Sequence, residues 1–241
     1  MIKYSIVIPF YNEEKNIYFV IKSLKKILKK IKDIEFILVN NGSTDNSIKV
    51  FNTILKKKNK KKFKYYKIKK NIGYGHGIKL GLSKANGNYL AWTHADMQTN
   101  PMDIVKAIKI IKKNKSKNLF IKGKRKNRNI KEIIQTVAMG YVSRLFLNVK
   151  IKDINAQPKI ITKSFYNRYV KKFAPNDLSL DLFAYYFALK KKYTIYEVDV
   201  LFKKRKYGEA KGGGGGGSIL AKLRLIFVTL RCLFYIKYLK I

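Results

Sequence analysis

Three short apolar runs of the sequence are each followed directly by side chains that could bind a nucleotide diphosphate and a metal ion. The runs cover residues 3–9, 35–39 and 89–93, and a glycine-rich turn lies at 73–77. The side chains that follow the three runs are Asn12, Glu13, Asn40, Asn41, Asp45, His94 and Asp96. Carboxamides suit a base and a ribose, whereas a carboxylate and an imidazole suit a divalent cation that bridges phosphates. Glycines let the backbone approach a ligand closely. If the three ends meet, the sequence predicts a nucleotide-diphosphate site there.

A parallel sheet would bring these ends together. Strand-like runs alternate with helical patterns along the chain, which is typical of an α/β fold that binds ligands at the carboxyl ends of its strands. We expect strands at 3–9, 35–39, 63–68, 89–93, 119–123, 158–162 and 193–202. We expect helices at 17–31, before 55, between 73 and 87, and at 103–113, 132–149 and 178–189. The run at 158–162 is predicted to be an edge strand.

The composition fits one globular domain, with 46% hydrophobic residues among 241. A single cysteine, Cys232, excludes an intramolecular disulfide and favours a reducing, cytosolic setting. The formal net charge of +40 has two explanations. One is an anionic partner, such as nucleic acid, an acidic membrane surface or phosphorylated substrates. The other is the codon bias of an AT-rich genome, which the excess of Lys over Arg favours.

The C-terminal part of the chain is set apart by six consecutive glycines at 212–217, which predict a flexible linker or a loop. The segment 218–241 after it is too interrupted by charge to span a bilayer. On a helix it carries two apolar stripes with basic residues between them. The first stripe is Leu220, Leu223, Phe227, Leu230, Phe234 and Tyr238; the second is Leu225, Val228, Tyr235, Ile236 and Leu239. Such an amphipathic helix needs two partners: the domain, and either a membrane interface or another copy of the chain. The alternative is a helix buried wholly in the core.

Four segments together resemble a known family. These are IVIPFYNEEKNI, FILVNNGSTDNS, NIGYGHGIKLGLSKANGNYLAWTHADMQTNP and VDVLFKKRKYGEAKGG. In this order they resemble the family 2 glycosyltransferases, most of all the branch of dolichyl-phosphate mannose synthases and polyprenyl-phosphate sugar transferases. The resemblance covers nearly all of the chain through Gly212. It implies a GT-A fold, which is a Rossmann-like, mostly parallel sheet flanked by helices, over residues 1–211.

The resemblance also implies roles for individual residues. His94, Ala95 and Asp96 match the metal-binding DxD triplet, with His in place of the first Asp. Asp96 would then bind Mg²⁺ or Mn²⁺, and His94 would supply a nitrogen to the metal or bind a phosphate. The residues implied to bind the nucleotide-sugar are Pro9, Tyr11, Asn12, Glu13, Asn41, Asp45, Gly73, Gly77, Ala95, Asp96, Gln98 and Lys124.

Two further residues would act in catalysis. Asp181 lies where an inverting member of the family places its general base, which a hydroxyl acceptor needs because it loses a proton as it attacks. A phosphate acceptor is already ionised and needs no base. Arg205 matches the basic loop that holds phosphates. Glu197 and Asp199, in the last predicted strand, are expected to form salt bridges.

The sequence therefore predicts an inverting glycosyltransferase that uses a nucleotide-sugar donor. The acceptor would be polyprenyl phosphate or a lipid-linked or surface glycan, reached by peripheral attachment to an anionic membrane at its inner, cytoplasmic face. Two alternatives remain: a basic nucleic-acid-binding protein, and a catalytically inactive relative of the family. The first is disfavoured because nothing in the chain supplies the aromatic and Arg surface of a nucleic-acid reader.

Overall fold

A seven-stranded sheet organises the part of the protein that the structure describes. The computed structural model describes residues 2–54, 61–114, 116, 118–128, 130–208 and 219–240. The strands are β1 (Tyr4–Phe10), β2 (Ile34–Asn40), β3 (Phe63–Lys67), β4 (Tyr89–Trp92), β5 (Leu119–Lys126), β6 (Lys159–Thr162) and β7 (Thr194–Leu201). They lie in the order β3-β2-β1-β4-β6-β5-β7, and only β6 runs antiparallel to its neighbours. The predicted linker at 212–217 lies outside the described residues.

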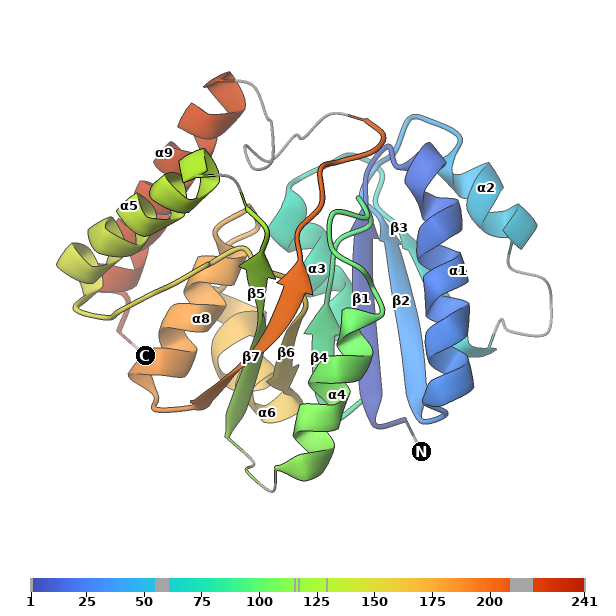
Figure 1. The fold of residues 1–241 in the computed structure, drawn as a ribbon, viewed down its shortest axis with the longest axis horizontal. Helices are drawn as coiled ribbons and strands as arrows, with labels where there is room; N and C mark the ends of the chain where they lie inside the picture. Colours follow the sequence, from blue (N-terminus) through green and yellow to red (C-terminus); the bar gives the residue numbers. More distant parts are fainter. Residues whose placement is uncertain are drawn as a thin grey trace.

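Helices cover both faces of the sheet (Figure 1). They are α1 (Glu14–Lys30), α2 (Ser47–Ile54), α3 (Tyr74–Ser83), α4 (Asp103–Lys113), α5 (Ile130–Leu147), α6 (Lys163–Phe165), α7 (Lys171–Phe173), α8 (Leu180–Lys190) and α9 (Ile219–Tyr238), with a π-helix, η2 (Tyr166–Val170), between α6 and α7. The predicted α/β fold with a mostly parallel sheet and a C-terminal helix is confirmed.

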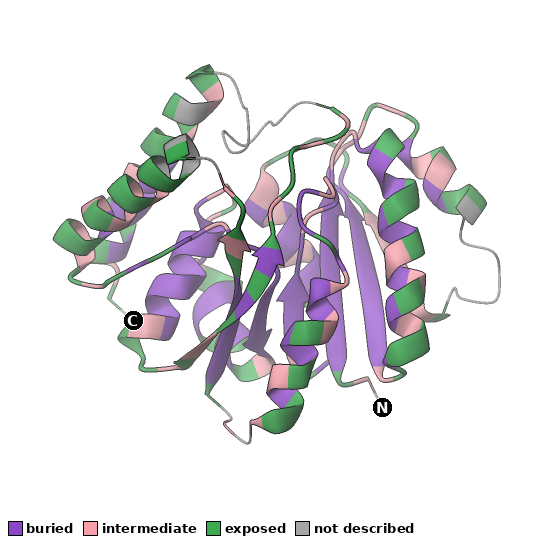
Figure 2. Ribbon diagram, in the orientation of Figure 1, coloured by how far each residue is buried: buried purple, intermediate pink, exposed green. Residues whose placement is uncertain are grey.

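The core consists of two apolar clusters, one on each face of the sheet (Figure 2). Ile6 and Ile8 of β1 pack in the cluster that holds α1 and α4, whereas Val7 packs in the cluster that holds α3 and α8. Successive side chains of a strand point to opposite faces, so a strand buried on both sides must be apolar throughout. This explains why β1 and β2 are continuous apolar runs in the sequence.

The prediction that 158–162 forms an edge strand is wrong. β6 lies inside the sheet, between β4 and β5, and all four of its side chains are buried. Pro158 suggested an edge because proline cannot donate to a strand ladder. It precedes the first residue of β6, however, and its carbonyl accepts a hydrogen bond from the Gly123 amide at 2.9 Å. No ladder donor is lost. The true edge on this side is β7.

The C-terminal helix α9 packs one face on the domain and leaves the other exposed. Its buried side chains include Val228, Cys232, Leu233 and Ile236. Beside it lies α5, and α8 lies beneath the pair (Figure 1). Leu220 and Leu223, from the first predicted stripe, are 78% and 57% exposed. The helix therefore exposes apolar side chains away from the domain, and a second partner for them stays a prediction. No helix of the described residues is long and apolar enough to cross a membrane.

Candidate active site

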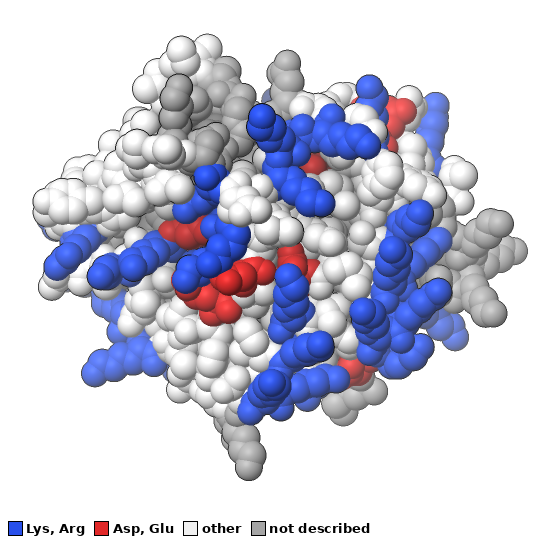
Figure 3. Space-filling view, in the orientation of Figure 1, with Lys and Arg blue, Asp and Glu red and all other residues white. Residues whose placement is uncertain are grey.

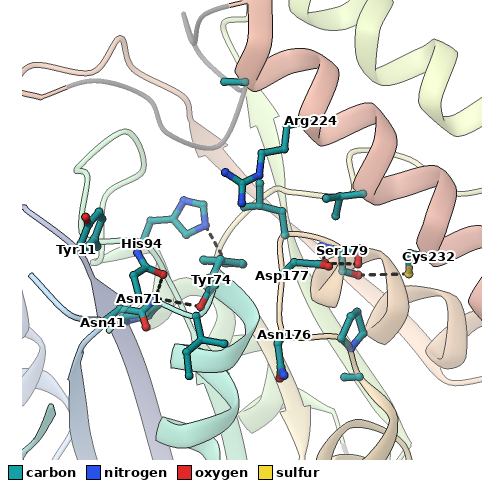
Figure 4. A pocket seen from close by; sticks show the side chains of 18 of the residues that line it. Tyr11, Asn41, Asn71, Tyr74, His94, Asn176, Asp177, Ser179, Arg224 and Cys232 are labelled. Atoms are coloured by element: carbon teal, nitrogen blue, oxygen red, sulfur yellow. Dashed lines mark hydrogen bonds between the residues drawn. The ribbon is translucent and has the colours of Figure 1, made fainter. Parts of the chain in front are cut away.

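A cleft of about 1170 Å³ opens where β1, β2 and β4 end and extends as far as α9 (Figure 4). We call its first side the strand-end wall. It is formed by Pro9, Phe10, Tyr11, Glu13, Asn41, Asn71, Ile72, Gly73, Tyr74, His94, Ala95, Asp96 and Arg205. We call the opposite side the α9 wall. It is formed by residues 173–179 together with Ala221, Arg224, Phe227, Val228, Arg231, Cys232 and Tyr235. The sheet thus brings the predicted strand ends together at one site.

Asp96 is the acidic group at the end of β4. Its Oδ1 accepts a hydrogen bond from the Gln98 amide at 3.0 Å. Its Oδ2 lies 3.7 Å from His94 Nδ1 and 3.9 Å from the guanidinium of Arg205. Burial alone would raise the pKa of Asp96, but His94, the Gln98 amide and Arg205 together lower it below its ordinary value. Asp96 is therefore an anion near neutral pH.

Arg205 joins the end of β1 to Asp96. Its guanidinium pairs with the carboxylate of Glu13, and its Nε donates to the Tyr207 carbonyl at 2.8 Å. Burial raises the pKa of Glu13, although Asn16 and Arg205 oppose the shift. The predicted phosphate-binding arginine thus lies in the same wall as the predicted metal ligand. A cation here can neutralise the charge of a bound diphosphate.

Tyr74, at the start of α3, lies between His94 and a buried carboxylate. Its hydroxyl is 2.9 Å from His94 Nε2 and 3.5 Å from Asp181 Oδ2 (Figure 4 shows the contact with His94). Burial, followed by the charges of Asp181 and Asp96, raises the pKa of Tyr74 well above its ordinary value, so it stays a neutral phenol. Sequence reasoning did not select this residue, although it lies inside the glycine-rich segment that carried the resemblance.

Asp181 does not line the cleft among the described residues. Its side chain is almost wholly buried and already accepts from several donors. Besides Tyr74 these are Trp92 Nε1 at 2.8 Å, Gln157 Nε2 at 2.9 Å and Lys159 Nζ at 3.2 Å. A general base needs a free lone pair within reach of the acceptor proton. The position of Asp181 therefore fits a supporting role better than the base that the sequence predicts.

His94 and Asp96 are the candidate metal ligands. Two ligand atoms that each lie about 2.1 Å from one ion are about 3 to 4 Å apart, and the 3.7 Å between His94 Nδ1 and Asp96 Oδ2 falls in this range. The described residues contain no group of three or more His, Cys, Asp or Glu side chains that could hold an ion. A two-ligand site fits Mg²⁺ or Mn²⁺ that also binds diphosphate oxygens and water, as is usual for nucleotide-bound Mg²⁺.

Five of the predicted nucleotide-binding residues do not line the cleft. Asn12 accepts from the Thr44 amide at 2.8 Å, and Asp45 accepts from the Ser47 amide at 3.0 Å, so both shape the turns beside the wall. The other three are Gly77, Gln98 and Lys124. Gly77 has no Cβ, which lets α3 approach Pro9 and Asn41. Gln98 donates to the Lys203 carbonyl, and Lys124 pairs with Glu197. All five residues thus serve structural contacts, and Lys124 lies on β5, which β6 separates from β4. The salt bridges predicted for Glu197 and Asp199 are confirmed.

Gly73 does line the cleft, but the reason that it is glycine lies in the fold. Its φ is +147°, a conformation that other residues rarely adopt. A Cβ at this position would lie 2.4 Å from the carbonyl oxygen of Asn176. Glycine is therefore required because the 71–74 segment packs on the 174–177 segment, which closes the floor of the cleft between its two walls.

The α9 wall contains functional candidates that the sequence did not indicate. Arg231 pairs with Asp177, whose Oδ1 also accepts from the Ser179 amide at 2.9 Å. Arg224 extends from α9 toward the cleft (Figure 4). It has no salt-bridge partner in the part of the chain that the structure describes. Cys232 is buried against the Ser179 carbonyl, and burial raises its thiol pKa to about 12, so it is not a nucleophile.

The comparison with known families decides the identity of this fold and site. The sequence model described as "Glycosyl transferase family 2" matches residues 5–179, which include the whole strand-end wall except Arg205. The chain belongs to glycosyl transferase family 2. The predicted family is thereby confirmed, and the matched residues form a glycosyltransferase domain. The match ends before Asp181, Arg205 and all of α9.

Curated relatives agree with this family. The chain is 33% identical over 143 residues to the "Uncharacterized glycosyltransferase YkcC" of Bacillus subtilis, a match that covers 58% of this chain and 43% of the relative. It is 30% identical over 107 residues to the "Undecaprenyl-phosphate 4-deoxy-4-formamido-L-arabinose transferase" of Proteus mirabilis, covering 44% of this chain and 32% of the relative. The chain spans about half or less of the length of the curated relatives it matches.

Solved structures share the fold at low sequence identity. A glucosyl-3-phosphoglycerate synthase from Mycobacterium tuberculosis, in complex with Mn²⁺, UDP and glucosyl-3-phosphoglycerate, is similar with a TM-score of 0.69 and 14% identity; the match covers 96% of this chain and 79% of that one. A mannosyltransferase from Pyrobaculum calidifontis, in complex with GDP-Man and Mn²⁺, has a TM-score of 0.61 and 14% identity, covering 86% and 58%. These likenesses establish the GT-A fold of this chain.

Proposed function

We propose that this protein transfers a sugar, with inversion, from a nucleotide-sugar to an acceptor at a membrane surface. The observation that carries the proposal is the strand-end wall, where one ionised carboxylate, Asp96, lies beside His94 and Arg205 at the meeting point of three strand ends. The nucleotide-sugar-binding residues, taken from the predicted set, are those that line this wall: Pro9, Tyr11, Glu13, Asn41, Gly73, Ala95 and Asp96.

The diphosphate of the donor would lie beside Asp96 and Arg205. A divalent cation bound by Asp96 and His94, Mg²⁺ or Mn²⁺, would neutralise the leaving nucleoside diphosphate. Arg205 is positioned to add a second positive charge to the same group, after exchanging part of its contact with Glu13 for the phosphates. The family membership and the solved relatives that contain UDP or GDP-Man support this placement.

The acceptor would approach from the α9 wall. Inversion requires attack from the side opposite to the leaving group, and the α9 wall lies across the cleft from the strand ends. Arg224 offers a positive charge on that side. Because Asp181 is fully engaged, an acceptor that is already ionised fits better than a hydroxyl. We therefore favour a polyprenyl phosphate over a glycan hydroxyl, in line with the name of the Proteus relative.

An apolar surface beside the cleft supports a membrane-bound acceptor. The neighbouring helices α5 and α9 expose Ile130, Ile133, Ile134, Val137, Tyr141, Leu145, Ile219, Leu220, Leu223, Ile226, Phe227, Phe234 and Tyr238. We call these residues the α5–α9 apolar face. Figure 3 shows this end of the molecule largely white, with Lys and Arg side chains along its lower edge. An apolar face with basic neighbours is typical of peripheral attachment to an anionic leaflet, which in cells is the cytoplasmic one.

A transfer assay tests the proposed function. Radiolabelled UDP- and GDP-sugars are incubated with Mn²⁺, the protein and anionic vesicles that contain polyprenyl phosphate. We expect label to enter the lipid fraction, a large loss in Asp96→Asn, and a weaker response to acceptor concentration in Arg224→Ala. Arg144→Ala, which removes an exposed charge from α5 outside the cleft, is the matched control. Transfer to a glycan hydroxyl, but not to the phosphate, would overturn the acceptor assignment. No transfer from any donor would count against the function.

A further inference from the structure

The two ring nitrogens of His94 face different partners. Nε2 lies 2.9 Å from the hydroxyl of Tyr74, and Nδ1 lies 3.7 Å from Asp96 Oδ2. A neutral imidazole carries a proton on one nitrogen and a lone pair on the other. Whether Nδ1 faces Asp96 with a lone pair or with a proton therefore depends on whether Tyr74 accepts from Nε2 or donates to it.

We infer that Tyr74, with Asp181 behind it, holds His94 in the tautomer whose Nδ1 binds the divalent cation. The inference rests on the proposed function in so far as a metal acts in this cleft. It assigns a positioning role to Tyr74 and Asp181, two residues that do not themselves contact the ion. Partners of this kind fix ring orientation in other metal sites, where a ligating histidine donates its second N–H to a neighbouring oxygen.

The surroundings of the Tyr74 hydroxyl favour this arrangement. The amide nitrogen of Gln157 donates to the hydroxyl oxygen at 3.1 Å, because an NH₂ group can only donate. The carboxyl oxygens of Asp181 face only donors, namely Lys159, Trp92 and Gln157 besides Tyr74. Tyr74 can therefore give its proton to Asp181 and still offer a lone pair to the Nε2–H of His94.

The opposite arrangement conflicts with a cation. If Tyr74 donated to Nε2, the proton of the ring would lie on Nδ1 and point toward Asp96. A metal ion at Asp96 would then meet an N–H in place of a lone pair, and the site would lose one of its two protein ligands. Without the ion, the Asp96 carboxylate attracts a proton to Nδ1, so binding of the ion selects the other tautomer, which Tyr74 and Asp181 support from the opposite side of the ring.

One nitrogen and one carboxylate also shape the choice of metal. Imidazole suits later transition metals, whereas sites made of oxygen ligands suit Mg²⁺, Ca²⁺ and Mn²⁺. We expect the parent protein to bind Co²⁺ more tightly, relative to Mg²⁺ and Mn²⁺, than His94→Asp does. This substitution gives the site two carboxylates, as in the DxD triplet, and removes the imidazole whose tautomer would matter.

Electron paramagnetic resonance tests the inference on Mn²⁺ itself, without an activity assay. Mn²⁺ is titrated into the folded protein, first alone and then with UDP or GDP, and spin-echo modulation is used to detect nitrogen bound to the ion. The variants are Tyr74→Phe, His94→Asp and the double variant. Tyr196→Phe is the matched control, since it removes a hydroxyl that bonds to Asn114 on another part of the sheet.

We expect nitrogen coupling in the parent protein and none in His94→Asp. Tyr74→Phe should weaken Mn²⁺ binding about 10- to 100-fold in the parent background, the usual loss when such a partner is removed, and no more than about twofold in the His94→Asp background. Tyr196→Phe should have no effect. Absence of nitrogen coupling in the parent would overturn the inference, and so would an equal loss in both backgrounds. Failure of UDP and GDP to bind while Mn²⁺ still shows nitrogen coupling would instead count against the proposed function.

Discussion

The two walls of the cleft are held in place in different ways. The strand-end wall follows from backbone geometry. The neighbouring strands β1 and β2 end level at Phe10 and Asn40, and β4 ends at Trp92, which pairs with Val7, so the residues after all three lie along one edge of the sheet. Buried hydrogen bonds and an ion pair support it from behind. The α9 wall depends on a helix far along the chain, held by apolar packing and by the exposed pair between Arg231 and Asp177. The proposed donor side is therefore the more rigidly supported part of the cleft, and the proposed acceptor side the less rigidly supported one.

The largest expected effect concerns the support behind the strand-end wall. Lys159 is fully buried and pairs with Asp181 at 3.2 Å. Removing one partner of a buried ion pair leaves an uncompensated charge, which typically costs about 3 to 5 kcal/mol. We expect Lys159→Met to lower the free energy of unfolding by about this amount, measured by urea denaturation. Arg231→Ala, which removes a half-exposed partner from the α9 wall, is the comparison. If both substitutions lowered the free energy of unfolding equally, the two walls would not differ in how strongly they are supported.

The same lysine predicts a pH dependence. Burial lowers the pKa of Lys159 from 10.5 to about 8, against the opposing charge of Asp181. Between these values the lysine is charged in the unfolded chain and neutral in the folded protein, so unfolding takes up a proton and the free energy of unfolding rises with pH. We expect the rise between pH 8 and pH 10 to be steeper in the parent than in Lys159→Met. Parallel slopes in urea denaturation would contradict this.

A change of intermediate size is expected in vesicle binding when charges are placed on the exposed side of α9. Leu220→Asp/Leu223→Asp places two charges on the α5–α9 apolar face without touching the cleft. Loss of apolar burial in the membrane should weaken binding to anionic vesicles by about tenfold or more in a flotation assay. Tyr18→Asp/Leu201→Asp, which adds the same charge at exposed apolar positions on other faces, should change it little.

Two results would change this account of the apolar face. If both double variants bind vesicles equally, the face is not the membrane contact. If the parent instead forms a dimer that Leu220→Asp/Leu223→Asp dissociates, and does not bind vesicles, the face joins two copies of the chain.

The smallest effect is expected for the ion pair of the α9 wall. Arg231 is 62% exposed, and exposed ion pairs contribute about 0 to 1 kcal/mol. Arg231→Ala should therefore lower the free energy of unfolding by less than about 1 kcal/mol, as measured by urea denaturation. A loss as large as that of Lys159→Met would mean that this pair, and not apolar packing, holds α9 in place.

The strand-end wall could be predicted because local patterns determine it. Each apolar run and the polar residues after it are adjacent in sequence, and the helix expected at 103–113 has the same bounds in the structure. The errors concern contacts between distant segments. β6 is an inner strand because β4 and β5 flank it, and neither neighbour can be identified from the run itself.

The supporting residues and the α9 wall could not be predicted for the same reason. Tyr74 and Asp181 are 107 positions apart, and no spacing rule connects them. Arg224 lies between two apolar stripes of one helix, which shows that it is on a boundary but not that the boundary faces the cleft. Such contacts depend on how α8 and α9 pack, and this packing is decided by the shape of the whole core.

Calorimetric titration of UDP and GDP, with and without Mn²⁺, tests the central claim most directly. It would be carried out on the parent protein, Asp96→Asn and Arg224→Ala. Asp96→Asn removes a carboxylate that would bind the ion directly, so its effect should reach or exceed the 10- to 100-fold loss typical of a supporting residue. We predict that one nucleotide binds the parent in a Mn²⁺-dependent manner, that Asp96→Asn weakens this binding about 100-fold, and that Arg224→Ala leaves it within about twofold. Equal binding to the parent and to Asp96→Asn, or no binding of either nucleotide, would contradict a metal-dependent donor site at the strand ends.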